Sequence, residues 1–262
     1  MIYSNGSDLP FLQFHSFPGD GILHHAVFTR AGGVSPAPFT SLNLSVSVPD
    51  ERANVYANRR RAYGFWGRDT SSVVHAHLVH GNAVARVTRA DDGSWVSHVD
   101  GVITDEPGCA LTMNFADCTP ILLYDPQKQA IGLGHAGWKG AIVDLPGAMV
   151  RAMQQSFGSE PQTLLAAVGP CIGPCCYEVG DEVISAVNGA FAQPQALLVD
   201  HGGPRPHFDL PLANQLNLQR AGVRSVEMSG LCTGCRTDLF YSHRVEKGRT
   251  GRFGAFLMLA AA

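Results

Sequence analysis

The sequence predicts an α/β fold with mixed sheets, of the α/β or α+β class. Short apolar runs that end at Gly, Pro or Asp indicate buried strands, and longer segments with apolar residues at three- and four-residue steps indicate amphipathic helices. The two kinds of segment alternate irregularly along the chain. A regular parallel barrel would repeat strand and helix in strict order, so we do not expect one.

Five segments are predicted to be strands because each is a short apolar or alternating run closed by a turn-forming residue. They are 22–29, 109–115, 120–124, 129–134 and 163–168. Four segments are predicted to be helices because their apolar residues recur on one helical face. They are about 51–64, 139–157, 179–192 and 208–221.

The composition favours a single domain over residues 1–262. A chain of 262 residues with 45% hydrophobic content can bury a large core. Pro and Gly are scattered through motifs and do not gather into a linker, and we find no charge block, internal repeat or low-complexity tract.

The net charge of −3 gives no general attraction to nucleic acid, although a local pocket for one phosphate stays compatible with it. No apolar run approaches the roughly 20 residues that a membrane helix needs, and the N-terminus lacks the pattern of a secretory signal. Seven cysteines, an odd number, favour reduced thiols and a cytoplasmic location over a disulfide framework. We expect no nucleic-acid or membrane partner, and a monomer or weak homodimer.

Three segments place metal-ligand residues beside small ones: Val-His-Gly at 79–81, Ala-Asp-Cys at 116–118 and His-Ala-Gly-Trp at 135–138. Two imidazoles and one thiolate suit zinc, and three protein ligands leave the fourth tetrahedral position open, as in catalytic sites. Residue types alone leave other interpretations open, because the chain has 11 His and 7 Cys. Many such residues are hydrogen-bonded structural histidines or small buried cysteines.

Two of these candidate ligands lie at predicted element boundaries. Cys118 follows the strand 109–115 and precedes Pro120, while His135 follows the strand 129–134, near the start of the long helix. Strand ends and helix starts are rigid scaffolding on which sites are often built. Small neighbours such as Gly137 leave room for the backbone to approach a ligand.

Six segments carry a family resemblance that spans nearly the whole chain in order. They are TRAGGVSPAPFTSLNL at 29–44, VHGNAV at 79–84, DGVITDEPGCALTMNFADCTPILLYDP at 100–126, GHAGWKG at 134–140, GPCIGPCCYEVG at 169–180 and CTGCRTDLFYSHRVEKGRTGR at 232–252. They resemble the multicopper polyphenol oxidase, or laccase-like, family, whose members are also described as zinc-dependent purine nucleoside phosphorylases.

The resemblance implies a site and a fold. It implies that His80, Cys118 and His135 bind Zn²⁺, with Cu²⁺ possible, and act in catalysis. It also implies two mixed sheets in an α/β/β/α layering. Arg30 and Asn43 fall where the family borders its substrate pocket, so Arg30 is a candidate to hold an anion and Asn43 to hydrogen-bond a base or sugar.

Further polar residues are candidates for the site. Arg244 and Arg252 are candidates for phosphate contacts, with a salt bridge or a solvated side chain as the alternative for each. Asp117 and Glu178 are candidates for general acid or base, or for positioning and helix-capping roles.

The chain departs from the family pattern at two positions. The family usually has Gln-Val-His-Gly where this chain has Leu78, and a Tyr where it has His243. Neither change touches a predicted ligand, so they bear on outer-shell hydrogen bonding and substrate preference.

The remaining cysteines in the matched segments are predicted to be isolated thiols. These are Cys171, Cys175, Cys176, Cys232 and Cys235. A Cys-x-x-Cys pair has the spacing of a zinc or redox site, but the first three lie in a run that resembles a turn of the family, and no thioredoxin-like pattern surrounds the pair. We therefore expect a single zinc ion per chain.

These features predict a zinc-dependent purine nucleoside enzyme. In phosphorolysis of adenosine, inosine or methylthioadenosine, phosphate attacks the ribose and the base departs. Adenosine deamination is a second implied activity, although the usual deaminase signature is absent.

Two alternatives come from other classes of chemistry. One is a copper-dependent polyphenol oxidase, for which the sequence offers no His-x-His cluster except His75-x-His77 beside His80. The other is a hydrolase that edits a peptidoglycan precursor, with Cys118 as nucleophile and His80 or His135 as base.

Overall fold

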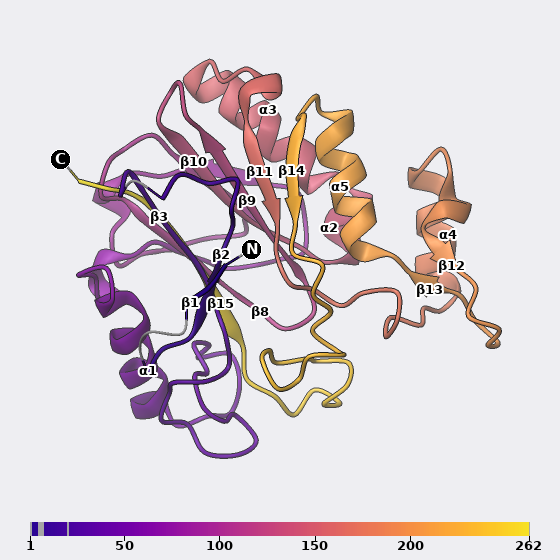
Figure 1. Ribbon diagram of the computed structural model, residues 1–262, viewed down its shortest axis with the longest axis horizontal. Coiled ribbons are helices and arrows are strands. Elements are labelled where there is room, and N and C mark those ends of the chain that lie inside the picture. Colours follow the sequence, from indigo (N-terminus) through magenta and orange to yellow (C-terminus); the bar gives the residue numbers. More distant parts are fainter. Residues whose placement is uncertain (1, 5–7, 20, 262) are drawn as a thin grey trace.

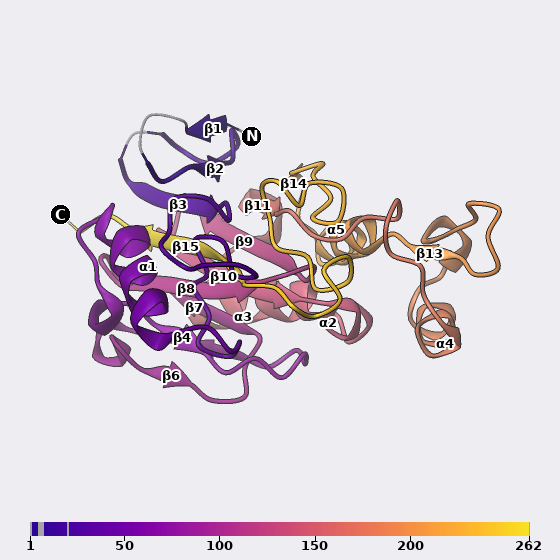
Figure 2. The same cartoon turned by 90° about the horizontal axis from the view of Figure 1, so that it is seen from below.

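The computed structural model describes residues 2–4, 8–19 and 21–261. Two β-sheets pack face to face, and helices cover the outer face of each, as Figures 1 and 2 show from two directions. This confirms the expected mixed α/β class and its α/β/β/α layering. No helix among the described residues is long and apolar enough to cross a membrane.

The first sheet has five strands, all antiparallel, so the expectation of two mixed sheets is wrong for this one. In spatial order they are β1 (Ile2–Ser4), β2 (Phe11–Gln13), β3 (Leu23–Phe28), β15 (Phe253–Leu259) and β8 (Ala110–Phe115). Helix α1 (Arg52–Gly64) covers its outer face, where Ala62 and Tyr63 join the apolar cluster that contains Phe28 and Phe256. The last strand of the chain therefore lies in the interior of this sheet.

The second sheet has six strands and mixed direction. In spatial order they are β14 (Ser225–Met228), β11 (Leu165–Val168), β9 (Thr119–Asp125), β10 (Ala130–Ala136), β7 (Gly101–Thr104) and β5 (Val84–Arg86). The pairs β14–β11 and β5–β7 are parallel, and the others are antiparallel. Helices α3 (Leu145–Phe157) and α5 (Leu210–Arg220) pack on its outer face.

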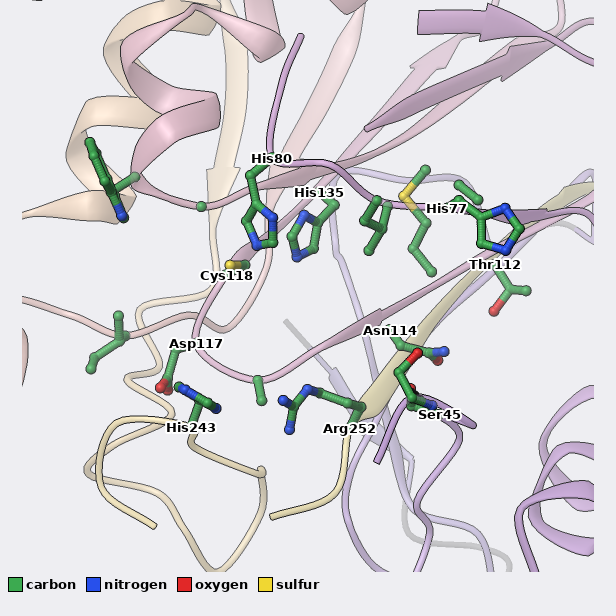
Figure 3. Close-up of a pocket in the computed structure, with 18 of the residues that line it drawn as sticks. Ser45, His77, His80, Thr112, Asn114, Asp117, Cys118, His135, His243 and Arg252 are labelled. Atoms are coloured by element: carbon green, nitrogen blue, oxygen red, sulfur yellow. Dashed lines mark hydrogen bonds between the residues drawn. The ribbon is translucent and has the colours of Figure 1, made fainter. Parts of the chain in front are cut away.

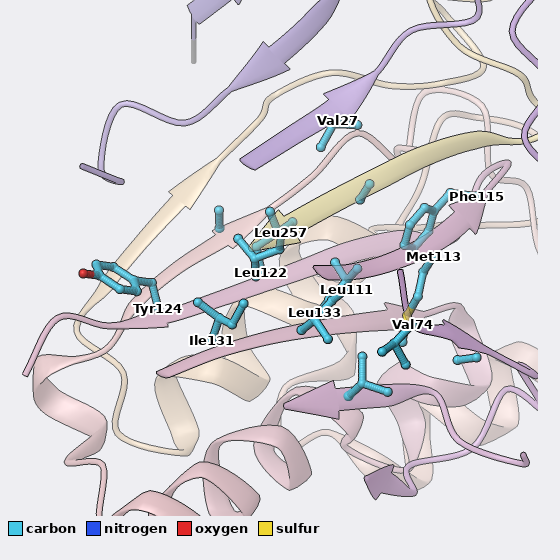
Figure 4. Close-up of a cluster of buried hydrophobic side chains, with 14 of the residues drawn as sticks. Val27, Val74, Leu111, Met113, Phe115, Leu122, Tyr124, Ile131, Leu133 and Leu257 are labelled. Carbon is cyan, nitrogen blue, oxygen red and sulfur yellow. The ribbon is translucent and has the colours of Figure 1, made fainter. Parts of the chain in front are cut away.

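The main core lies between the two sheets. Leu111, Phe115 and Leu257 from the first sheet meet Leu122 and Leu133 from the second (Figure 4). Every residue of β9 and β10 is buried, because α3 covers the face that the first sheet does not. Each large apolar side chain removed from water contributes about 1.5–3 kcal/mol, so this sandwich is a rigid base for the strand ends.

All five predicted strands and the helices near 51–64, 179–192 and 208–221 are confirmed. The predicted helix 139–157 is instead two helices, α2 (Trp138–Ile142) and α3. Asp144 between them has a left-handed backbone (φ 58°), and its side chain accepts a hydrogen bond from the Gly147 amide as the N-cap of α3. Pro146 lacks an amide hydrogen and suits the first turn of a helix, so α2 cannot run on through it.

A protruding segment, residues 173–209, extends from one end of the sandwich (Figures 1 and 2). It contains α4 (Asp181–Ala190) and a small hairpin of β12 (Leu198–Val199) and β13 (His207–Phe208). Its apolar side chains form a separate, smaller cluster with Ala141 of α2 and Leu210 of α5. A second short pair, β4 (His75–Ala76) and β6 (Trp95–Val96), lies at the edge of the cavity described below.

The buried imidazole of His25 predicts a pH-dependent loss of stability. Burial lowers its pKa to about 4, and its Nε2 accepts a hydrogen bond of 2.8 Å from the Phe14 amide. An unfolded histidine titrates near 6.5, so the unfolded chain binds more protons between these two values. The contribution of neutral His25 is complete above about pH 6.5 and is lost as the pH falls towards 4.

We expect the wild-type free energy of unfolding to fall by about 2 kcal/mol more than that of His25→Gln between about pH 7.5 and pH 5. Urea unfolding of both proteins at each pH measures this difference. The exposed His15 is the matched control, and His15→Gln should keep the wild-type pH dependence. Identical curves for wild type and His25→Gln would contradict the prediction.

Candidate metal centre

His80, Cys118 and His135 form a compact cluster. Their ligand atoms all lie within 4.8 Å of one another (Figure 3). Cys118 lies in the turn between β8 and β9, and His135 lies near the end of β10, where it pairs with Pro120 of β9. Strand pairing therefore brings Cys118 and His135 together, and the loop after β4 adds His80.

Asp100 holds two of the three ligands. Its carboxylate accepts hydrogen bonds from the amides of Val79 (3.1 Å), His80 (3.0 Å) and Gly81 (2.8 Å). Its Oδ1 also lies 3.3 Å from Nδ1 of His135, which directs Nε2 of that ring towards the cluster. Asp100 is not among the residues predicted from the sequence, because neither its position nor its spacing distinguishes it from a surface aspartate.

The backbone is strained at two residues of the cluster. His80 has φ 61° and Asp117, next to Cys118, has φ 84°, both in the left-handed region that favours glycine. Such residues cost about 1–3 kcal/mol each and persist where the surroundings over-determine them. The Asp100 contacts supply that constraint for His80.

Cys118 and His135 stabilise each other's charged forms. Burial alone would raise the pKa of the Cys118 thiol, but the adjacent imidazoles of His135 and His80 hold it at about 6. Burial alone would lower the pKa of His135, but the Cys118 thiolate and the Asp100 carboxylate raise it to about 9. The site therefore favours a thiolate, which is the form that binds metals.

Gly137 lies so close to the cluster that no side chain fits at this position. A Cβ atom at this position would lie 2.8 Å from Sγ of Cys118 and 3.5 Å from Cδ2 of His80. The sequence-based expectation that small residues allow a close approach is met here. Two imidazoles and a thiolate at the wall of a cavity fit a zinc or copper ion with one coordination position free for a ligand.

The cluster forms one wall of a cavity of about 610 Å³. Arg252 and His243 lie on the opposite side of the cavity from the cluster. Ser45 and Asn114 lie on the same side as Arg252 (Figure 3). A volume of this size is typical of a small-molecule site. The cavity therefore brings together metal-ligand, cationic and neutral polar groups.

An aromatic wall closes one end of the cavity. The indole of Trp95 stacks on His75 (centroids 4.6 Å apart) and on His77 (5.0 Å). These two histidines are thus committed to ring stacking. Among the described residues, the two groups that could hold a metal include neither of them, so His75-x-His77 does not form a copper cluster with His80.

Arg30 and Asn43 do not line the cavity. The Arg30 guanidinium pairs with Glu246 (3.0 Å), donates to the Thr237 carbonyl (2.7 Å) and lies over the ring of Tyr241. Asn43 is fully buried. Both residues are placed as supports of the C-terminal loop.

Asn43 positions Arg252. The Asn43 side-chain oxygen accepts from the Arg252 amide at 2.9 Å. The Arg252 guanidinium lines the cavity and donates to the carbonyls of Thr250 (3.1 Å) and Gly251 (2.8 Å), and burial lowers its pKa. Arg252 is therefore half-buried and lines the cavity, whereas Arg244 is exposed and Arg30 does not line the cavity.

Arg244 also lines the cavity, and its backbone amide is hydrogen-bonded to Asp117, which is next to Cys118 of the cluster. The Asp117 carboxylate accepts from the Arg244 amide (2.6 Å) and from the Thr233 hydroxyl (2.6 Å). Both carboxylate oxygens of Asp117 are therefore engaged in hydrogen bonds to neighbouring segments. Glu178 contributes its backbone carbonyl, which accepts from the Arg244 guanidinium at 2.6 Å.

The two positions that depart from the family pattern, Leu78 and His243, both line the cavity. Both residues therefore lie where they could contact a molecule bound in the cavity.

The expectation of isolated thiols is wrong for four cysteines. The sulfur atoms of Cys175, Cys176, Cys232 and Cys235 all lie within 4.8 Å of one another. The two pairs come from segments about 60 residues apart, so tertiary structure alone brings them together. Cys171 is buried and lies outside this group.

The chain is similar to known proteins over most of its length. Residues 24–260 match the family described as multi-copper polyphenol oxidoreductase laccase. The chain is 36% identical over 243 residues to a protein of Bacillus subtilis named purine nucleoside phosphorylase YlmD, covering 89% of this chain and 87% of the relative. It is also 36% identical over 244 residues to a purine nucleoside phosphorylase of Pseudomonas aeruginosa, covering 93% and 96%.

The fold is also that of a solved structure. The crystal structure of YlmD from Geobacillus stearothermophilus matches with a TM-score of 0.91 and 35% identity over 98% of each chain.

The lack of space at Gly137 predicts that Gly137→Ala disrupts the metal centre. We expect the variant to lose the same share of bound zinc as Cys118→Ala, because the added methyl group displaces the thiolate. Metal analysis after dialysis measures the loss. Gly189→Ala is the matched control: Gly189 lies in α4 with nothing within 4 Å of an added Cβ, and this variant should keep its zinc. Full zinc retention in Gly137→Ala would contradict the assigned geometry.

Proposed function

The chain belongs to the multi-copper polyphenol oxidoreductase laccase family, and from its relatives' names and its cavity we propose that it catalyses zinc-dependent phosphorolysis of purine nucleosides. Adenosine, inosine and methylthioadenosine are the proposed substrates. The observation that carries this proposal is that the His80–Cys118–His135 cluster lines one cavity together with two arginines, Arg244 and Arg252.

In this reaction a phosphate oxygen forms a bond to the anomeric carbon of the ribose. The bond from that carbon to the purine nitrogen breaks, its electron pair goes to the purine, and the purine takes up a proton. The products are the free base and ribose 1-phosphate. Catalysis then needs a held phosphate, an oriented ribose and stabilisation of the departing charge.

Arg252 is the proposed phosphate-holding residue, with Arg244 as its partner. Arg252 is half-buried in a site that excludes part of the solvent, where a charge-assisted hydrogen bond to phosphate is stronger than at the surface. Its backbone is fixed by Asn43, so the guanidinium is preorganised. Arg30 is excluded from direct contact by its pairing with Glu246.

The aromatic wall is the proposed site of the purine. His77 and Trp95 present ring surface at the end of the cavity, and Asn114 and Ser45 supply polar groups near it. Flat aromatic surface favours a flat base, while polar groups fix its orientation.

A zinc ion held by His80, Cys118 and His135 would supply a Lewis acid beside the bound substrate. Asp100 maintains the tautomer and direction of the His135 ring. The thiolate form of Cys118 is available above about pH 6, whereas His135, whose pKa is raised to about 9, would release its ring proton when the metal binds.

The thiolate of Cys118 beside the charged imidazole of His135 also favours a second candidate, a cysteine-dependent hydrolase. Such an enzyme would work without metal. Metal removal therefore separates the two candidates, whereas alkylation of Cys118 would abolish both activities.

The direct test is product analysis with the zinc-loaded protein. We expect adenosine, inosine and methylthioadenosine to yield free base and ribose 1-phosphate (or its methylthio derivative) only when phosphate is present. Chelation should abolish the reaction, and added zinc should restore it. Ammonia release from adenosine without phosphate would indicate deamination. Oxidation of phenols by copper-loaded protein with no nucleoside cleavage would favour the oxidase and overturn the proposal.

A second prediction separates Arg252 from Arg30. We expect Arg252→Gln to raise the KM for phosphate by about 10- to 100-fold at unchanged zinc content, because a charged hydrogen bond to the nucleophile is lost. Arg30→Gln should lower the melting temperature but leave that KM unchanged, since Arg30 supports the C-terminal loop. Steady-state kinetics with varied phosphate decide the matter. A raised KM for phosphate in Arg30→Gln, with an unchanged KM in Arg252→Gln, would indicate that Arg30 binds the phosphate.

A further inference from the structure

The four-cysteine group has the dimensions of a zinc site. Sγ of Cys235 lies 3.2 Å from Sγ of Cys175 and 3.4 Å from Sγ of Cys176, and all four sulfurs, with Cys232, lie within 4.8 Å. Four thiolates at the usual Zn–S distance of about 2.3 Å surround the ion with S···S separations of about 3.8 Å. The two shortest sulfur–sulfur contacts are below this value by about half an ångström, and no pair exceeds 4.8 Å, so small side-chain shifts would admit the ion.

The backbone holds the two cysteine-bearing segments in register. Cys171 and Cys232 form an isolated parallel β-bridge, with a hydrogen bond of 3.0 Å from the Thr233 amide to the Cys171 carbonyl. The next residues turn tightly, since the Cys176 amide donates to the Gly173 carbonyl at 3.0 Å. The thiols therefore converge because of main-chain pairing that does not itself involve the sulfur atoms.

Backbone amides point at one of the sulfurs. The Gly173 amide donates to Sγ of Cys232 at 3.2 Å, and the amides of Gly234 and Cys235 are directed at the same atom. Amide hydrogen bonds stabilise a thiolate over a thiol, and a thiolate is the form that binds zinc.

Gly234 lets the segments approach. A Cβ atom at Gly234 would lie 2.9 Å from Cβ and 3.0 Å from Sγ of Cys176. A side chain at position 234, in the sequence between Cys232 and Cys235, would collide with Cys176, so only glycine fits there.

We propose that Cys175, Cys176, Cys232 and Cys235 bind a second zinc ion, separate from the ion of the candidate metal centre. None of these cysteines lines the cavity, and four protein ligands leave no position for substrate, so the site is structural. Cys175 and Cys235 are exposed, so zinc can enter from solvent. The proposal is independent of the proposed function.

The zinc would connect the beginning of the protruding segment to the loop that contains Cys232 and Cys235. Cys175 and Cys176 stand at the beginning of residues 173–209, whose own apolar cluster is small. On the other side, Thr233 follows Cys232 directly and its hydroxyl donates to Asp117, which is next to the candidate ligand Cys118. The zinc would thus steady two loops that border the cavity.

The test is zinc stoichiometry of the full-length chain purified under reducing conditions. We expect two zinc ions in the wild type, one in the double variant Cys232→Ser/Cys235→Ser, and one in Cys118→Ala. Cys109→Ala is the control, since Cys109 is buried in the main core, and it should retain two. The double variant should also melt several degrees below wild type, because structural zinc binding contributes to folding.

Cobalt substitution keeps the test decisive if the double variant does not fold. In Cys118→Ala the four cysteines are intact, and bound cobalt should show intense thiolate charge-transfer absorption with tetrahedral visible bands. One zinc in wild type and none in Cys118→Ala would overturn the proposal. So would a disulfide among the four cysteines in the protein purified without reductant, detected by mass spectrometry, if zinc stoichiometry stays at one after reduction.

Discussion

The carboxylate of Asp100 is the contact on which the metal centre depends. It accepts three successive backbone amides of the loop that carries His80, and it lies against Nδ1 of His135. The buried carboxylate thus gains hydrogen bonds that offset its desolvation, and its pKa stays below the ordinary value despite burial. One side chain fixes a strained loop and a ring orientation at once.

A second set of contacts joins the centre to the groups proposed to bind substrate. Asp117 sits in the turn next to Cys118 and holds the Arg244 amide and the Thr233 hydroxyl, while Asn43 holds the Arg252 amide. Hydrogen bonds therefore join the turn that carries Cys118 to the C-terminal loop. Since the proposed four-cysteine zinc site begins one residue from Thr233, metal binding there would stiffen the same wall of the cavity.

Much of the fold followed from local pattern, and its misses have local causes. Strand β9, which follows Cys118, and strand β10, which carries His135, are apolar runs buried on both faces. The strand β15 was not predicted, because its apolar run does not alternate and periodicity cannot distinguish such a run from a buried helix. The helix predicted over 139–157 breaks at Asp144, where capping by one side chain outweighs the helical periodicity.

The sequence by itself determined the types of the three ligands, the class of fold and, through its motifs, the family. Those properties depend on residue chemistry and on spacing within one segment. The tertiary structure alone decided that Arg252 and not Arg30 enters the cavity, that Asp100 orients His135, and that four cysteines meet. Each of these facts joins segments far apart in the chain, and such contacts depend on how the two sheets and the loops at their ends are packed, which no local pattern encodes.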